Sequence, residues 1–140
     1  MTENNKPFEI EFLDHVAIMV ADLEASSKWY EKVLGLKRYQ LPKWGEFPIF
    51  LLSGKTGIAL FPAENKSIKT DPDSKHIKID HFAFNVTREN YQKAKQRYRQ
   101  LNLDFYERDH YYFDSIYTLD PDGHKVELTT IKVAEKDFYK

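Results

Sequence analysis

The chain has 140 residues, of which 41% are hydrophobic and 15% aromatic. This length fits one compact domain, and the apolar share is too high for a disordered chain. Its 21 basic and 22 acidic side chains leave a net charge of −1, so the composition does not favour nucleic acid or anionic lipid as a partner. Cysteine is absent, which excludes disulfides, thiolate metal ligands and a cysteine nucleophile. Because residues 1–10 are polar and no apolar run approaches the length of a membrane span, we expect a cytoplasmic protein with no membrane partner.

An internal repeat organises the sequence. Residues 13–20 read Leu-Asp-His-Val-Ala-Ile-Met-Val, and residues 79–86 read Ile-Asp-His-Phe-Ala-Phe-Asn-Val. Both follow the order apolar-Asp-His-apolar-Ala-apolar-any-Val, and both have the length and composition of a strand. The repeat predicts two modules with the same topology.

A helical pattern and three short strands follow each repeat. Asp22 can cap a helix that ends near Gly35, and Thr87 can cap a helix that ends near Asn102. The further strands are expected near residues 37–41, 47–53 and 57–61, and again near 104–109, 115–119 and 124–130. The fold class is therefore α+β, with paired βαβββ modules whose two curled mixed sheets form a cleft. We place the first module at about 12–61, a linker at 62–78, the second module at about 79–130 and a C-terminal tail at 131–140, all within one domain.

Strand alternation places one histidine of each module on the sheet face that would line the cleft. Successive strand residues point to opposite faces, so His15 and His81 lie opposite the apolar residues that would pack on the helices. In the last strand, Glu127 lies between Val126 and Leu128 and shares the face of the histidines. If the sheets curl towards one another, these three side chains converge. Two imidazoles and a carboxylate suit a divalent metal (manganese, iron, nickel, cobalt or zinc), with open positions of the kind found at catalytic sites.

The alternative reading is that each histidine is an ordinary packed or surface residue, which is the more frequent case for a single histidine on a strand. Equivalent repeat positions favour the metal site. His76, His110 and His124 fall outside the shared face in this reading, in the linker and in two turns, and are left out of the site.

The motifs resemble those of the vicinal-oxygen-chelate superfamily, which includes glyoxalase I, fosfomycin-resistance proteins, bleomycin-binding proteins and extradiol dioxygenases. The segments that carry the resemblance are residues 13–17, 29–36, 79–81 and 120–128, the last reading Asp-Pro-Asp-Gly-His-Lys-Val-Glu-Leu. The resemblance implies two βαβββ modules that cup a metal held by His15, His81 and Glu127. It also implies that substrate oxygens bind the metal directly.

This sequence departs from two members of the superfamily. Ala59 stands where glyoxalase I carries a second glutamate ligand, which puts the two-glutamate mechanism in doubt. Ala17 and Lys136 stand where fosfomycin-resistance proteins tend to carry threonine and arginine, which disfavours fosfomycin itself. The segment Ser115-Ile116-Tyr117 resembles one in those proteins that places a tyrosine in the cavity.

These observations predict an enzyme in which the metal acts as a Lewis acid on a small oxygen-rich substrate. The reaction classes left open are lyase or isomerase, thiol-transferase and dioxygenase chemistry, so a thiol co-substrate is among the expected partners. Glu127 and Tyr117 are the candidate catalytic residues, although cross-strand packing explains Tyr117 equally well. A homodimer is expected from the strand edges and aromatic excess. The alternative function is metal-free binding of a small molecule, as in the bleomycin-resistance type.

Overall fold

The computed structural model of the chain describes residues 6–139. The first five residues of the polar N-terminal stretch, and the last residue of the expected C-terminal tail, lie outside this range. Within it, no helix combines the length and the apolar character that a membrane crossing would need.

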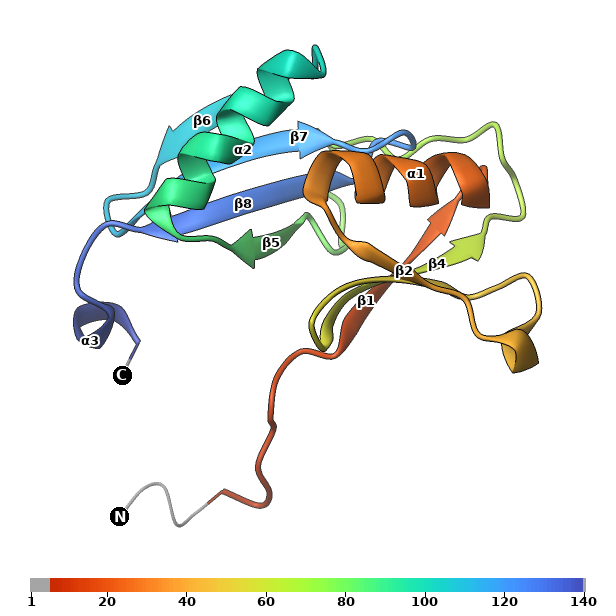
Figure 1. The fold of residues 1–140 in the computed structure, drawn as a ribbon, viewed down its shortest axis with the longest axis horizontal. Helices are drawn as coiled ribbons and strands as arrows, with labels where there is room; N and C mark the ends of the chain where they lie inside the picture. Colours follow the sequence, from red (N-terminus) through yellow and green to blue (C-terminus); the bar gives the residue numbers. More distant parts are fainter. Residues whose placement is uncertain (1–5, 140) are drawn as a thin grey trace.

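The first half of the chain forms a four-stranded sheet covered by one helix (Figure 1). Its strands lie in the order β1-β4-β3-β2, with β1 parallel to β4 and the other neighbours antiparallel. The elements are β1 (His15–Val20), α1 (Leu23–Leu34), β2 (Lys37–Tyr39), a 3-10 turn η2 (Pro42–Trp44), β3 (Ile49–Ser53) and β4 (Thr56–Pro62). Strand β1 is therefore an edge strand of this first sheet.

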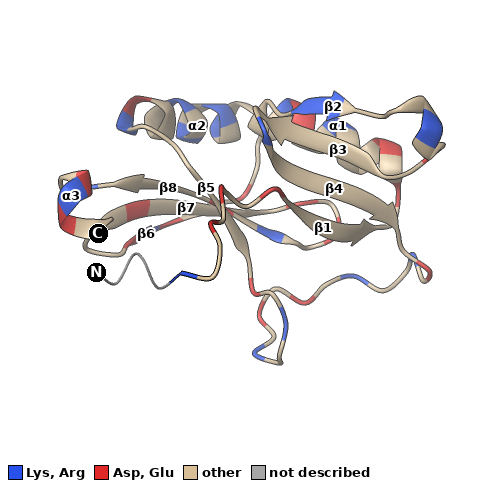
Figure 2. Cartoon of the chain, turned by 90° about the horizontal axis from the view of Figure 1, so that it is seen from below, with Lys and Arg blue, Asp and Glu red and all other residues tan. Residues whose placement is uncertain are grey.

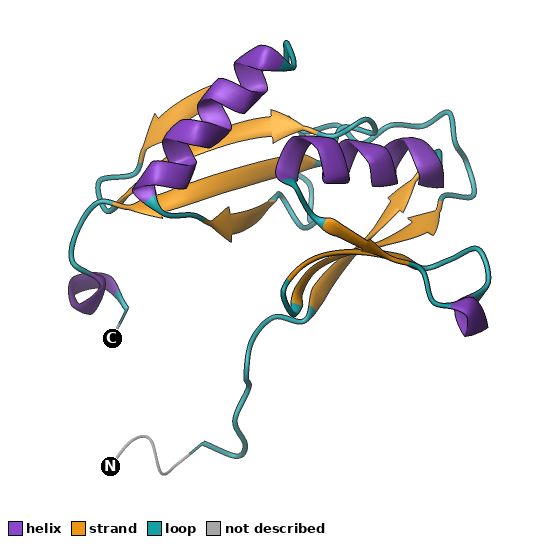
Figure 3. Ribbon diagram, in the orientation of Figure 1, coloured by secondary structure: helices purple, strands orange, loops and turns teal. Residues whose placement is uncertain are grey.

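The second half repeats this arrangement. Its strands lie in the order β5-β8-β7-β6, again with one parallel pair, β5 and β8, at one edge. The elements are β5 (Phe82–Asn85), α2 (Arg88–Gln100), β6 (Tyr106–Asp109), β7 (Phe113–Leu119), β8 (Lys125–Ile131) and a short helix α3 (Glu135–Phe138). Figure 3 shows α3 set apart from the two long helices. Nothing in the sequence pattern had indicated η2 or α3. The paired βαβββ architecture of two mixed sheets is confirmed.

Local signals in the sequence set the limits of both long helices. The Asp22 side chain accepts a hydrogen bond from the backbone N–H of Ala25 at 3.0 Å, and the Thr87 hydroxyl accepts one from Asn90 at 3.1 Å. These bonds satisfy backbone donors that a helix start leaves free. At the other ends, Gly35 (φ 68°) and Asn102 (φ 54°) adopt the left-handed conformation expected for a C-terminal cap.

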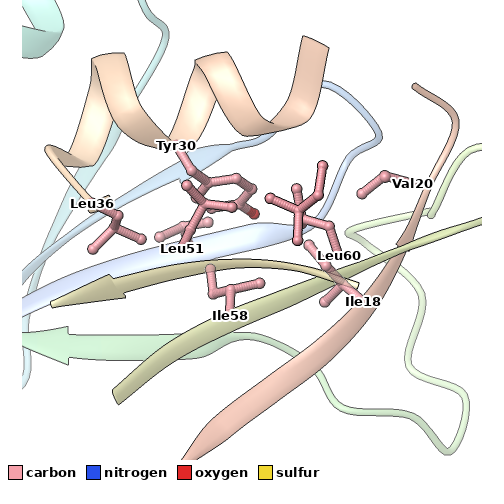
Figure 4. Packing of buried hydrophobic residues seen from close by; sticks show 9 residues of the cluster. Ile18, Val20, Tyr30, Leu36, Leu51, Ile58 and Leu60 are labelled. Carbon is pink, nitrogen blue, oxygen red and sulfur yellow. The ribbon is translucent and has the colours of Figure 1, made fainter. Parts of the chain in front are cut away.

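The hydrophobic core lies between the helices and one face of each sheet. In the first half, Tyr30 of α1 points down onto Ile18, Leu51, Ile58 and Leu60 (Figure 4). Helix α1 also contributes Val33 to the core of the second half, and Val126 of β8 joins the first cluster. Since α1 serves both clusters, the two halves are one packed body. The opposite faces of the sheets remain open.

The turn Asp120-Pro121-Asp122-Gly123 links the second half of the chain to the first through hydrogen bonds and an ion pair. The buried Tyr30 hydroxyl donates to Asp120 Oδ2 at 2.8 Å, and Asp122 accepts from the Ala21 backbone at 3.2 Å and pairs with Lys69 at 2.7 Å. Burial raises the pKa of the Asp120 carboxyl, although the Tyr30 hydroxyl and two backbone N–H groups partly oppose this rise. These hydrogen-bond donors therefore stabilise the charged form of the buried Asp120 side chain.

We expect Tyr30→Phe to lower the free energy of unfolding by about 1–3 kcal/mol, because it leaves a buried carboxylate oxygen without its donor. Urea denaturation measures the change. Tyr111→Phe is the control, since Tyr111 is 85% exposed. Equal stability of the wild-type and Tyr30→Phe proteins would show that water or another group satisfies Asp120.

Candidate functional site

His81 and Glu127 form the centre of the candidate site. His81 immediately precedes β5, and Glu127 lies on the neighbouring strand β8. The distance between His81 Nε2 and Glu127 Oε1 is 2.8 Å. Glu127 is only 7% exposed, and both side chains line a cavity of about 590 Å³ on the open face of the second sheet. A buried carboxylate beside an imidazole nitrogen is a donor pair that fits a divalent metal.

Asp80 fixes the orientation of the His81 ring. Its Oδ2 lies 2.8 Å from His81 Nδ1 and 3.7 Å from Lys125 Nζ. The hydrogen bond from His81, together with the positive charge of Lys125, keeps the pKa of Asp80 below its usual value. A proton on Nδ1 directed at Asp80 would leave Nε2 as the metal-binding nitrogen, which is the usual arrangement around metal-bound histidines.

Tyr117 and His110 stand beside the pair in the same cavity. The Tyr117 hydroxyl lies 2.8 Å from His110 Nε2, and the Tyr117 ring meets the His81 ring edge-on at 5.6 Å. Burial raises the pKa of Tyr117 to about 12, and the negative charge of Glu127 adds to this rise. The tyrosine therefore keeps its proton at neutral pH and can serve as a hydrogen-bond donor.

His110 also lines this cavity, which the sequence did not indicate. The sequence predicts His110 in a turn away from the shared face, whereas the structure places it at the cavity with His81 and Glu127. The hairpin between β6 and β7 turns sharply after His110, where Tyr111 adopts a φ of 66°, and this turn directs the imidazole to Tyr117 in the cavity. Strand alternation does not extend through a turn, so the pattern carried no signal for it.

The third predicted ligand, His15, lies on the other sheet. It is the first residue of β1, its side chain is 37% exposed, and its Nδ1 is 2.8 Å from Asp14 Oδ1. This bond matches the one between His81 and Asp80. Within residues 6–139, no three side chains of the metal-binding types come close enough to hold an ion. One chain therefore brings together His81 and Glu127, but not His15.

The packing of the edge strands explains this separation. Val16 of β1 and both Phe82 and Phe84 of β5 pack against the same core cluster. The two strands thus meet through the faces opposite to the histidines. His15 and His81 consequently point away from this shared core.

A family model of the Glyoxalase/Bleomycin resistance protein/Dioxygenase superfamily matches residues 12–128. The chain belongs to this superfamily. The match spans both βαβββ modules and includes the predicted ligands at residues 15, 81 and 127. The resemblance inferred from the repeated Asp-His motif is thereby confirmed.

The curated superfamily relatives are named as transferases. A metallothiol transferase FosB from Lysinibacillus sphaericus is 31% identical over 135 residues, which cover 94% of this chain and 91% of the relative. A glutathione transferase FosA from Serratia marcescens is 29% identical over 119 residues, covering 85% and 80% of the two chains. The expectation that the chain is an enzyme of this superfamily is confirmed. The type of reaction is left open.

Solved superfamily structures agree with the fold. A glyoxalase/dioxygenase from Nostoc punctiforme matches with a TM-score of 0.74 at 19% identity, covering 91% of this chain and 96% of that one. The fosfomycin resistance protein FosX from Mesorhizobium loti matches with a TM-score of 0.65 at 26% identity, covering 91% and 98%.

Proposed function

We propose that this protein is a divalent-metal-dependent transferase that joins a thiol to a small, oxygen-bearing electrophile such as an epoxide. The observation that carries the proposal is the His81–Glu127 pair, which is oriented by Asp80 and sits in a cavity large enough for a small molecule. The names of the FosA and FosB relatives favour thiol transfer among the reactions of the superfamily. A cytoplasmic location stays a prediction.

His81 Nε2 and Glu127 would hold the metal, with His15 as the third ligand. Two neutral imidazoles and one carboxylate accept manganese, iron, nickel, cobalt or zinc, and leave open positions for substrate oxygens. A metal bound there would supply Lewis-acid chemistry at a substrate oxygen. The residues of the chain would then orient the substrate and control its proton.

In thiol transfer to an epoxide, the sulfur forms a bond to a ring carbon while the bond from that carbon to oxygen breaks. The oxygen keeps the electron pair and gains the proton that the thiol gives up, so the product is a hydroxy thioether. Tyr117 would donate a hydrogen bond to this oxygen as its negative charge develops. His110 would hold the Tyr117 hydroxyl in position through their 2.8 Å contact.

We further propose that His15 comes from a second copy of the chain. Strands β1 and β5 are both edge strands, so their free backbone groups are available for pairing. Pairing β1 of one copy with β5 of the other would bring His15 of one copy beside His81 and Glu127 of the other. In a dimer with a two-fold axis, this junction between β1 of one copy and β5 of the other forms twice. The arrangement is that of the expected homodimer.

The assay that tests the function uses protein loaded with manganese and follows the loss of free thiol in the presence of an epoxide. We expect metal-dependent thioether formation, but negligible isomerisation of a glutathione hemithioacetal. The buried Ala59 cannot replace a second glutamate as ligand or base. Isomerisation at rates typical of enzymes, about 1–1,000 per second, would contradict this assignment. Protein that retains no metal and consumes no thiol would favour the alternative function, metal-free binding of a small molecule.

A further inference from the structure

Four aromatic side chains that contact one another line the cavity that contains His81 and Glu127. We call this set the aromatic wall; its members are Tyr112, Phe113, Phe138 and Tyr139. Phe138 of α3 is at its centre, with its ring centroid 4.7 Å from that of Phe113, 5.1 Å from Tyr139 and 6.0 Å from Tyr112. The first contact is edge-on, with an interplanar angle of 86°. These spacings are those of interacting aromatic rings, so the C-terminal segment is a built part of the cavity.

The same cavity also presents polar groups. There the His81–Glu127 pair lies beside Tyr117, whose ring stacks on Tyr106 at 5.0 Å with an interplanar angle of 14°. The cavity thus combines a small polar centre with a largely aromatic lining. This is the composition of sites that bind an organic ring and orient it through a few polar atoms.

Positive side chains do not contribute to this cavity. Among residues 6–139, neither lysine nor arginine lines it. Lys125, which shares the face of Glu127 on β8, lies 3.7 Å from the Asp80 carboxylate. Recognition of a phosphonate would instead call for arginine or lysine aimed at its oxygens.

The open face of the first sheet also carries aromatic side chains. Figure 2 shows β1, β3 and β4 without charged residues, whereas β2 and helix α1 carry several. On this face, Phe50 stacks on Trp44 at 5.2 Å and meets the His15 ring at 4.9 Å. One cation, Lys37, also lies on this face, with its Nζ 5.3 Å from the centre of the Tyr39 ring. If His15 of a second copy completes the site, it would bring aromatic surface with it.

We propose that the substrate of this site is an aromatic compound without a phosphonate or similar anionic group, whose ring packs against the aromatic wall while its oxygen atoms face His81 and Glu127. The proposal rests on the proposed function for the role of the metal. The ring-binding half depends only on the aromatic wall, so it can be tested on its own.

The test compares two neutral diols with identical oxygen atoms, 1-phenylethane-1,2-diol and 1-cyclohexylethane-1,2-diol. Their dissociation constants are measured by ligand-observed NMR on the full chain, with and without manganese, and metal content is determined in parallel. We expect the phenyl compound to bind about 2- to 10-fold more tightly in both states, the range of specific aromatic pair interactions. In Phe138→Leu the preference should disappear, since leucine keeps the apolar contact and removes the ring. Tyr111→Leu, on the same hairpin as Tyr112 but outside the cavity, should keep it.

Equal binding of the two diols by the wild-type protein would overturn the proposal, and so would an unchanged preference in both Phe138→Leu and Tyr112→Leu. Fosfomycin bound more tightly than the phenyl diol by the manganese-loaded protein would overturn it as well. These outcomes differ from failure of the proposed function. Protein that prefers the phenyl diol but retains no metal would refute the metal site alone, whereas protein that retains metal without the preference would refute the aromatic substrate alone.

Discussion

Glu127→Gln should lose its bound metal while remaining folded. Glutamine keeps the shape of the side chain but removes the negative charge that would balance the ion. Loss of an outer-sphere partner typically lowers metal affinity by 10- to 100-fold, so loss of the only carboxylate ligand should lower it by more than about 100-fold. The measurement is metal per chain after dialysis, and a thermal melt serves as the folding control.

Other histidine variants define where the site lies. His15→Ala and His81→Ala should both release the metal. His124→Ala should retain it, because His124 Nε2 contacts the Met19 carbonyl at 2.9 Å and lies outside the cavity. His110→Ala should also retain metal and should instead impair turnover through Tyr117. Wild-type metal content in Glu127→Gln, or metal loss in His124→Ala, would mean that the site lies elsewhere.

The fold could be predicted because its signals are local and occur twice. The repeated Asp-His strand, the caps at Asp22 and Thr87, and the left-handed residues Gly35 and Asn102 each follow from a few neighbouring residues. Alternation predicts the face on which each strand residue lies. In the structure, Glu127 pairs with Ala83 and Tyr117 on the two neighbouring strands. Local patterns therefore predicted the face on which His81, Tyr117 and Glu127 lie together.

The rest of the site depends on contacts that no local pattern encodes. His110 reaches Tyr117 only because a hairpin turns at Tyr111, and Phe138 reaches Phe113 only because the C-terminal segment folds back onto β7. Likewise, alternation puts His15 and His81 on equivalent faces but does not say whether those faces meet within one chain. That is decided by Val16 and Phe82, on the opposite faces, which both pack against one core cluster.

Mixing two inactive variants should restore metal binding if the site forms between copies. His15→Ala keeps an intact His81–Glu127 pair, and Glu127→Gln keeps an intact His15. In a mixed dimer, one junction combines the two intact halves and the other combines the two damaged halves. Random pairing of equal amounts makes half of the dimers mixed, so about one quarter of all junctions should bind metal.

Neither variant alone should bind appreciable metal, and the mixture should regain this fraction after unfolding and refolding together. Metal per chain, measured after dialysis, is the readout, and sedimentation at micromolar concentration checks that dimers are present.

The control mixture pairs His81→Ala with Glu127→Gln. These two changes fall in the same half of the junction, and no pairing of the two chains restores it. A mixture of His15→Ala and Glu127→Gln that stays metal-free, although dimers form, would show that His15 binds metal within its own chain or not at all. Recovery in the control mixture as well would show that metal binds without the His81–Glu127 pair.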